Sequence, residues 1–123
     1  MKFSEADTSG GLLIKGYEQG RIRVGSTDYR ASLIVAPDRV IDDWPPQTVD
    51  ELRAEHFTPI LALNPQVIVL GTGETHRFPD PACYVAAMEK GIGVEIMETG
   101  AACRTYNILM AEGRSVAAAL IMI

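Results

Sequence analysis

Apolar and polar residues alternate differently in the two parts of this chain. In the first third, short apolar runs are separated by glycine-containing turns, a pattern typical of short strands. Leu12 to Gly20 and Arg21 to Gly25 are predicted to form a β-hairpin that turns at 18–20, and STDY (26–29) is predicted to be a second turn. Two further strands are expected in RASLIVAP and RVIDDW, the second of which ends at two prolines that forbid regular hydrogen bonding.

The middle of the chain contains a helix start signal. Thr48 is followed three residues later by Glu51, which is the spacing of a capping box. Asp50 also favours this position because a helix N-terminus carries partial positive charge. A helix of about two turns is therefore predicted to end before Pro59, which cannot sit in a helix interior.

From Gln66 onward, predicted strands and helices alternate. They are a strand at Val67 to Leu70, a helix at Pro81 to Lys90 closed by Gly91, a strand at Val94 to Met97, a helix at Thr99 to Gly113 and a strand at Ser115 to Ile121. This order predicts parallel strands joined by right-handed crossovers. The runs VIVL and VAAALIMI fit strands covered on both faces, so the chain is predicted to be an α/β protein.

Composition sets the class of protein. A chain of 123 residues, 47% apolar and 22% charged, has the size and composition of one globular domain that spans residues 1–123. The formal charge is −5 and the basic residues are scattered, so no nucleic acid partner is expected. The longest apolar run is too short for a transmembrane segment, and residues 1–11 do not have the pattern of a signal or transit peptide. A cytoplasmic location is expected, in which Cys83 and Cys103 stay reduced.

The glycine-rich stretch VIVLGTGETH suggests a phosphate-binding loop, but its spacing does not fit. A dinucleotide fingerprint needs a third glycine where His76 stands, and a phosphate loop needs a glycine-lysine pair that does not follow Gly73. The plainer interpretation is that Gly71 and Gly73 allow a tight exit from a buried strand. The other interpretation is that they line a cleft.

The cleft hypothesis follows from topology. If the strands ending at Leu70 and Met97 are parallel, GTG and METG lie at the same sheet edge, where open α/β sheets bind ligands. Thr99 would then cap a helix whose first amides attract anions. The predicted ligand-binding residues are Gly71, Thr72, Gly73, Thr99, Arg104 and Asn107. Alternatively, Arg104 pairs with a structural carboxylate such as Glu95 or Glu98.

Other candidate chemistry is weakly supported. Cys103 near a helix start beside Arg104 has a setting that favours a thiolate, although a buried cysteine is usually a small apolar residue. His56 and His76 lack neighbouring ligands at metal-binding spacing. Asp42 and Asp43, adjacent on an extended chain, would point to opposite faces. We therefore expect no catalytic set, no metal and no cofactor.

Three segments carry a resemblance to a known family: LIVAP with the tryptophan that follows, VIVLGTG, and GIGVEIMETGAACRTYNILMAEGRSVAAALI. They resemble the Mth938-like domain of unknown function, a family that includes the mitochondrial complex I assembly factor 3. The resemblance covers Leu12 to Ile121. It implies a three-layer fold, with a central mixed, mostly parallel sheet, helices packed on it and an N-terminal β-hairpin.

The resemblance implies no particular reaction or cofactor, so two functional hypotheses remain. The first is a non-catalytic interaction module that binds protein partners and assists assembly of a membrane or redox complex. The second is a small-molecule or anion-binding protein, or an enzyme, that uses the crevice at the carboxyl ends of the parallel strands. The hairpin edge also makes a homodimer one of the expectations.

Overall fold

The computed structural model describes residues 11–123, which form two sheets and a set of helices. The strands are β1 (Ile14–Glu18), β2 (Arg21–Val24), β3 (Thr27–Tyr29), β4 (Leu33–Ala36), β5 (Arg39–Ile41), β6 (Val67–Gly71), β7 (Gly93–Met97) and β8 (Val116–Leu120). The α-helices are α2 (Thr58–Leu61), α3 (Val85–Glu89) and α4 (Thr99–Ala111), and the 3-10 helices are η1 (Val49–Glu51), η2 (Ala54–Phe57) and η3 (Pro81–Cys83).

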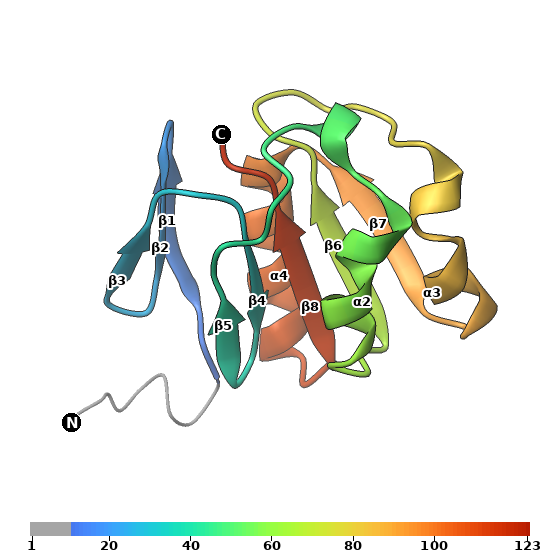
Figure 1. The fold of residues 1–123 in the computed structure, drawn as a ribbon. Coiled ribbons are helices and arrows are strands. Elements are labelled where there is room, and N and C mark those ends of the chain that lie inside the picture. Colours follow the sequence, from blue (N-terminus) through green and yellow to red (C-terminus); the bar gives the residue numbers. More distant parts are fainter. Residues whose placement is uncertain (1–10) are drawn as a thin grey trace.

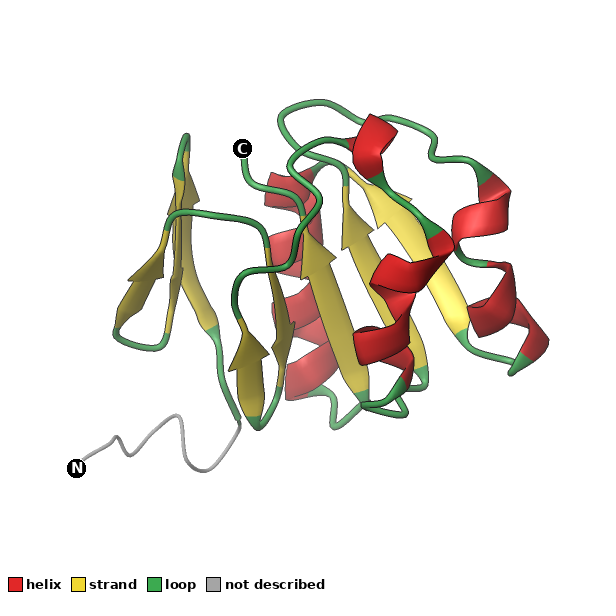
Figure 2. Ribbon diagram, viewed as in Figure 1, coloured by secondary structure: helices red, strands yellow, loops and turns green. Residues whose placement is uncertain are grey.

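The larger sheet has five strands in the order β5-β4-β8-β6-β7. Strand β6 is parallel to both of its neighbours, β7 and β8, as the alternation of strands and helices predicts. Strand β4 pairs antiparallel with β8 and β5, which makes the sheet mixed. Helix α4 covers one face, and α2 and α3 cover the other, so the predicted three layers are confirmed (Figure 1; Figure 2).

The central strands are apolar throughout because both of their faces are buried. Every residue of β6 and β8 is buried. Along β6, Val67 and Val69 pack in the core on the α4 side, and Ile68 and Leu70 pack in the other core with Phe57. The period of two between successive side chains therefore divides one apolar run between two cores.

The N-terminal hairpin is confirmed, and the STDY prediction is corrected. Gly20 makes the first turn and Gly25 the second, each with a positive φ. Because the second turn is already complete at Ser26, Thr27–Tyr29 is free to pair with β2 as strand β3. STDY is therefore mostly strand, and the first sheet is β1-β2-β3.

The segment after Pro46 also differs from the prediction. The Thr48 side chain makes no cap hydrogen bond, and the helix stops after the single 3-10 turn η1. Leu52 then adopts an extended conformation and is buried. Pro59 lies in the first turn of α2, where its missing N–H removes no helical hydrogen bond. Pro59 was predicted to end the preceding helix, but in the structure it stands at the start of the next one.

Two smaller corrections concern local geometry. Asp43 has a φ of 60°, in the left-handed region, so the chain at Asp42 and Asp43 is not regular strand. The predicted helix at 81–90 is divided into η3 and α3, although Gly91 does end it, with a φ of 76°. Trp44 is buried, and its Nε1 donates to the carbonyl of His56 at 2.9 Å, which ties the chain after β5 to η2.

Candidate functional site

The loops after β6 and β7 meet at one edge of the sheet, as predicted. The parallel pairing places Gly71 opposite Met97. Beyond these residues, the Gly73 amide donates to Thr99 Oγ1 at 2.8 Å, and the Thr99 amide donates to the Gly73 carbonyl at 2.9 Å. GTG and METG are thus hydrogen-bonded directly to each other.

Close contact between strand and helix explains Gly71, and backbone conformation explains Gly73. A Cβ atom at Gly71 would lie 2.7 Å from Thr99 Oγ1 and 3.0 Å from Thr99 Cα. Gly73 has a φ of +100°, which side chains rarely tolerate. Gly71 is therefore needed for the N-terminus of α4 to pack against the end of β6, and Gly73 is needed for the bend of the chain after β6.

The predicted helix cap at Thr99 is wrong, because the N-cap is Glu98. The Glu98 carboxylate accepts hydrogen bonds from the amides of Gly100 at 2.7 Å and Ala101 at 3.0 Å. Thr99 is the first residue of α4 and is fully buried, and its hydroxyl donates to the Ile121 carbonyl at 2.7 Å. The first amides of α4, expected to attract an anion, are thus bound to a carboxylate of the chain itself.

Arg104 and Asn107 lie on the side of α4 that faces the N-terminal hairpin. The Arg104 guanidinium contacts the Tyr17 hydroxyl and lies 5.8 Å from the Tyr17 ring centre and 3.7 Å from the Glu98 carboxylate. The Asn107 side chain accepts from the Ile14 amide at 2.9 Å and donates to the Ile14 carbonyl at 2.8 Å. Asn107 thus forms hydrogen bonds with the backbone N–H and C=O of Ile14 in β1, as a residue of a neighbouring strand would.

The structure distributes the six predicted residues over three places. Gly71, Gly73 and Thr99 are in direct contact, while Arg104 and Asn107 face β1. Thr72 and Gly73 line a hollow of about 240 Å³ together with Arg77 and the C-terminal residues 121–123. The proposed ligand-binding role of these residues stays a prediction.

Both cysteine thiols are free and buried. Burial raises the pKa of Cys103 to about 12, and the Glu98 carboxylate adds to this, while Arg104 acts in the opposite direction. Burial also raises the pKa of Cys83. At neutral pH both side chains therefore behave as small apolar groups, in keeping with the plainer interpretation of Cys103.

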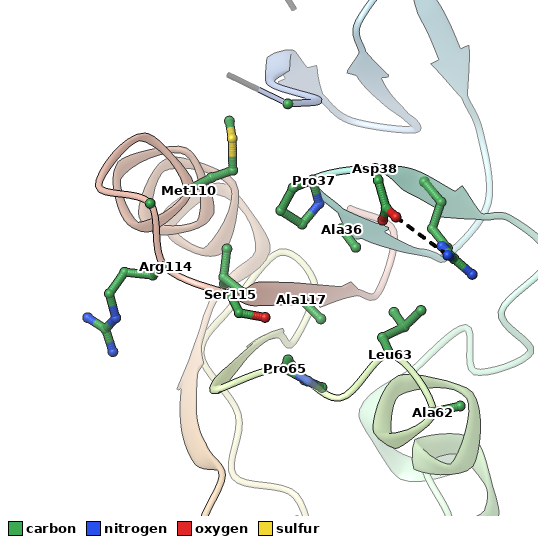
Figure 3. A pocket seen from close by; sticks show the side chains of 14 residues that line it. Ala36, Pro37, Asp38, Ala62, Leu63, Pro65, Met110, Arg114, Ser115 and Ala117 are labelled. Atoms are coloured by element: carbon green, nitrogen blue, oxygen red, sulfur yellow. Dashed lines mark hydrogen bonds and ion pairs between the residues drawn. The ribbon is translucent and has the colours of Figure 1, made fainter. Parts of the chain in front are cut away.

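A hollow of about 570 Å³ lies at the opposite end of the sheet, beside the start of β8. Figure 3 shows Pro37, Leu63 and Met110 around it, whereas the guanidinium of Arg114 points away. The side chains that surround this hollow are mostly small or apolar. They indicate no particular chemistry.

The sequence analysis did not identify a group of exposed apolar side chains on the surface. Phe78, Val85 and Met88 are 83%, 47% and 58% exposed, and all three lie in the connection from β6 to β7. Phe78 also lines a hollow of about 420 Å³ between this connection and the segment from Val49 to Ala54. A signal was present, because in the predicted helix at 81–90 apolar residues recur at intervals of three on the side opposite Cys83 and Ala87.

The fold and the carboxyl edge of its parallel strands define a class: a small three-layer α/β domain in which hydrogen bonds join the two crossovers at that edge. The chain belongs to the family described as "Protein of unknown function (DUF498/DUF598)", whose model matches residues 14–121. This confirms the resemblance found in the sequence.

Three relatives are informative. A "13 kDa major membrane protein" of Francisella tularensis is 30% identical over 98% of this chain and 99% of its own length. The "NADH dehydrogenase [ubiquinone] 1 alpha subcomplex assembly factor 3" of Drosophila melanogaster is 32% identical over 94% of this chain and 61% of its own length. A solution structure of a Mth938-like domain from Bordetella pertussis superposes with a TM-score of 0.81, at 28% identity, over 98% of this chain and 91% of that one. Within residues 11–123, no helix is both long and apolar enough to cross a bilayer.

Proposed function

We propose that this chain is a non-catalytic protein-binding module that assists assembly of a membrane or redox complex and works on the cytoplasmic side. The observation that carries the proposal is the 32% identity, over 94% of the chain, to an assembly factor of NADH dehydrogenase. The likeness extends over nearly the whole chain, so it concerns the complete domain and not one motif within it.

The contacts at the carboxyl edge support this proposal. The groups that a ligand would bind there are engaged inside the chain: Glu98 holds the first amides of α4, and Thr99 joins Gly73 to Ile121. Three of the four large exposed apolar side chains of residues 11–123 lie in the β6–β7 connection, and the fourth, Ile108, lies on α4. A contiguous group of exposed apolar side chains is typical of a surface that binds a protein, whereas single ones are common on any protein.

A gene deletion in the source cell tests the proposal. We expect membranes of the deletion strain to contain less fully assembled NADH dehydrogenase, visible on native gels as smaller subcomplexes, and to oxidise NADH more slowly. Expression of the chain from a plasmid should restore both. Unchanged amounts of every large membrane complex in the deletion strain would contradict the proposal.

A second candidate function is the binding of a small anion at the carboxyl edge. The hollow of about 240 Å³ favours it, because Thr72, Gly73 and Arg77 line it at the sheet edge where α/β proteins commonly hold ligands. The Arg77 guanidinium already binds Asp50 at 2.8 Å, so an anion would have to compete with that carboxylate. A rise in melting temperature with added inorganic phosphate, lost in Arg77→Gln, is the expected result, and its absence would remove this candidate.

A further inference from the structure

The connection from β6 to β7 presents apolar side chains to solvent along one line. Phe78, Val85 and Met88 are large and exposed, and Ala82 is exposed as well. Ala82, Val85 and Met88 follow at intervals of three, which places them on one side of the successive turns η3 and α3. Cys83 and Ala87, on the other side, are buried. We name Phe78, Ala82, Val85 and Met88 the exposed apolar strip.

A hollow of about 420 Å³ adjoins this strip. Phe78 and Ala82 line it from the strip, and Val49, Leu52 and Arg53 line it from the facing segment. Val49 and Leu52 are buried, so the hollow reaches apolar side chains below the surface. Such a hollow beside an exposed aromatic ring can receive one large apolar side chain of a partner.

The walls of the hollow are held in place by hydrogen bonds. The Arg53 guanidinium donates to the carbonyls of Asp50 at 3.1 Å and Leu52 at 2.9 Å. The Cys83 thiol donates to the same Leu52 carbonyl at 3.4 Å, and Arg77 binds the Asp50 carboxylate at 2.8 Å. The two segments are therefore joined before any partner arrives, which lowers the entropic cost of binding.

The border of the strip is acidic. Between Phe78 and Glu89 the chain carries Asp80 and Glu89 and no lysine or arginine, although Arg77 and Lys90 stand directly beside the two ends of this stretch. In the two segments that surround the hollow, residues 49–55 and 74–90, six acidic residues stand against three basic ones. Two of those basic residues, Arg53 and Arg77, are turned toward groups of the chain itself. A complementary partner surface is apolar at its centre and basic at its rim.

We propose that the exposed apolar strip and its hollow bind a cationic amphipathic helix of a partner protein, an inference that rests on the proposed function. Such a helix presents apolar anchors at intervals of three and four residues, the spacing that the strip itself has. One large anchor enters the hollow beside Phe78, and lysine or arginine side chains lie near Asp80 and Glu89.

Two other occupants fit less well. A second copy of the chain would bring the same carboxylates together across the contact. The strip also supplies only four side chains, which suits the apolar face of one helix, whereas a stable interface between two folded chains has roughly 20 residues per side. An anionic membrane would repel the acidic border and a chain with a formal charge of −5.

A peptide titration of the full chain tests the inference by NMR. The probe is an 18-residue Leu/Lys helix-forming peptide, and the matched peptides carry Glu for Lys or Ser for Leu. We expect the Leu/Lys peptide to shift the amide signals of residues 49–55 and 78–89, and each matched peptide to bind at least about tenfold more weakly. Shifts confined to other surfaces, or equal binding of the Leu/Glu peptide, would overturn the proposal.

Variants of exposed residues locate the site without disturbing the core. Val85→Ser combined with Met88→Ser should weaken peptide binding at least about tenfold. Ile108→Ser is the matched control, because Ile108 has the same exposed fraction as Met88, 58%, but lies on α4. We expect this control to stay within about twofold of the natural chain, as for a residue outside the contact. Equal losses of peptide affinity in the double variant and in Ile108→Ser would contradict binding at the strip.

Three further measurements separate the alternatives. A concentration-dependent dimer that the double variant abolishes would assign the strip to a second copy. Binding to phosphatidylglycerol vesicles that the double variant abolishes would assign it to a membrane. Either result overturns the proposal. In the deletion strain, full rescue by the double variant would refute binding at the strip but would be consistent with the proposed function. A deletion without effect would refute the proposed function, and the peptide titration would then decide on the strip alone.

Discussion

The two crossovers of the parallel strands begin at the same sheet edge but differ in construction. The β7–β8 crossover is the thirteen-residue helix α4, which starts within two residues of its strand. The β6–β7 crossover is a loop followed by η3, of three residues, and α3, of five. They lie on opposite faces of the sheet (Figure 1).

The difference shows in what each crossover buries. Helix α4 places Ala102, Cys103, Tyr106 and Met110 in the core on its side, and it also holds the edge of β1 through Asn107. The β6–β7 crossover buries Cys83, Ala87 and Ile92, and leaves the large apolar side chains of Phe78, Val85 and Met88 exposed. The β7–β8 crossover therefore supplies a core helix, whereas the β6–β7 crossover leaves Phe78, Val85 and Met88 exposed, which is where we propose that a partner binds.

The largest expected effect is in α4. Tyr106→Ala should lower the free energy of unfolding by about 3–5 kcal/mol, because it empties a fully buried site. Met88→Ala, in the other crossover, should stay within about 0.5 kcal/mol of the natural chain, as is usual for exposed positions. Urea denaturation measures both. Tyr106→Phe is the control, and losing the 2.8 Å bond from the Tyr106 hydroxyl to the Leu12 carbonyl should cost about 1 kcal/mol. A large loss in Met88→Ala would show that the exposed crossover also stabilises the fold.

The second prediction concerns the point where the two crossovers meet. Gly71→Ala should destabilise the chain by about 1–3 kcal/mol, since the added methyl group would overlap Thr99, whose hydroxyl is fixed by two hydrogen bonds. Gly93→Ala in β7 is the matched control, because its nearest neighbour would be 3.8 Å away. We expect the control to be neutral in the same thermal or urea unfolding measurement. Equal stability of both variants would mean that the edge is loose enough to admit a ligand.

These two crossovers also show what the sequence could and could not predict. The buried strands were predictable because VIVL and VAAAL are continuous apolar runs, and α4 was predictable from its length and apolar spacing. The cap of α4 was not, because threonine is a preferred N-cap residue and glutamate is not, yet the N-cap is Glu98. The choice depends on Gly73 and Ile121, which are 26 and 22 residues away from Thr99 along the chain and bind its hydroxyl.

The failures elsewhere have the same origin. The spacing of Thr48 and Glu51 fits a capping box, yet η1 ends after one turn because Leu52 is drawn into the core in an extended conformation. For Arg104 the sequence left two alternatives, a bound ligand or a structural carboxylate. The structure shows the Glu98 carboxylate beside Arg104, and Tyr17 of the hairpin in contact with it. Local signals thus predict the regular elements, while contacts between distant segments decide the ends of elements and the site.

The cysteines give a third prediction, because each crossover contains one. Cys83 should be alkylated by iodoacetamide at least about tenfold faster than Cys103, which corresponds to a local opening free energy lower by about 1.4 kcal/mol. The reason is that η3 is a single short turn, whereas Cys103 lies in α4. Mass spectrometry of tryptic peptides measures both rates in one sample, and Cys83→Ser and Cys103→Ser check that the rates are independent. Equal rates would mean that both crossovers open only with global unfolding.

The smallest effect is expected at Arg104, where the two hypotheses for the β7–β8 crossover diverge. Arg104→Gln should change the free energy of unfolding by less than about 1 kcal/mol, because the guanidinium is mostly exposed and its ion pair with Glu98 is 3.7 Å long. If Glu98 occupies the start of α4 in place of a ligand, inorganic phosphate should raise the melting temperature of the natural chain and of Arg104→Gln by the same amount. A phosphate-dependent rise in the natural chain that is missing in Arg104→Gln would instead place an anion at α4, and both crossovers would then carry a binding site.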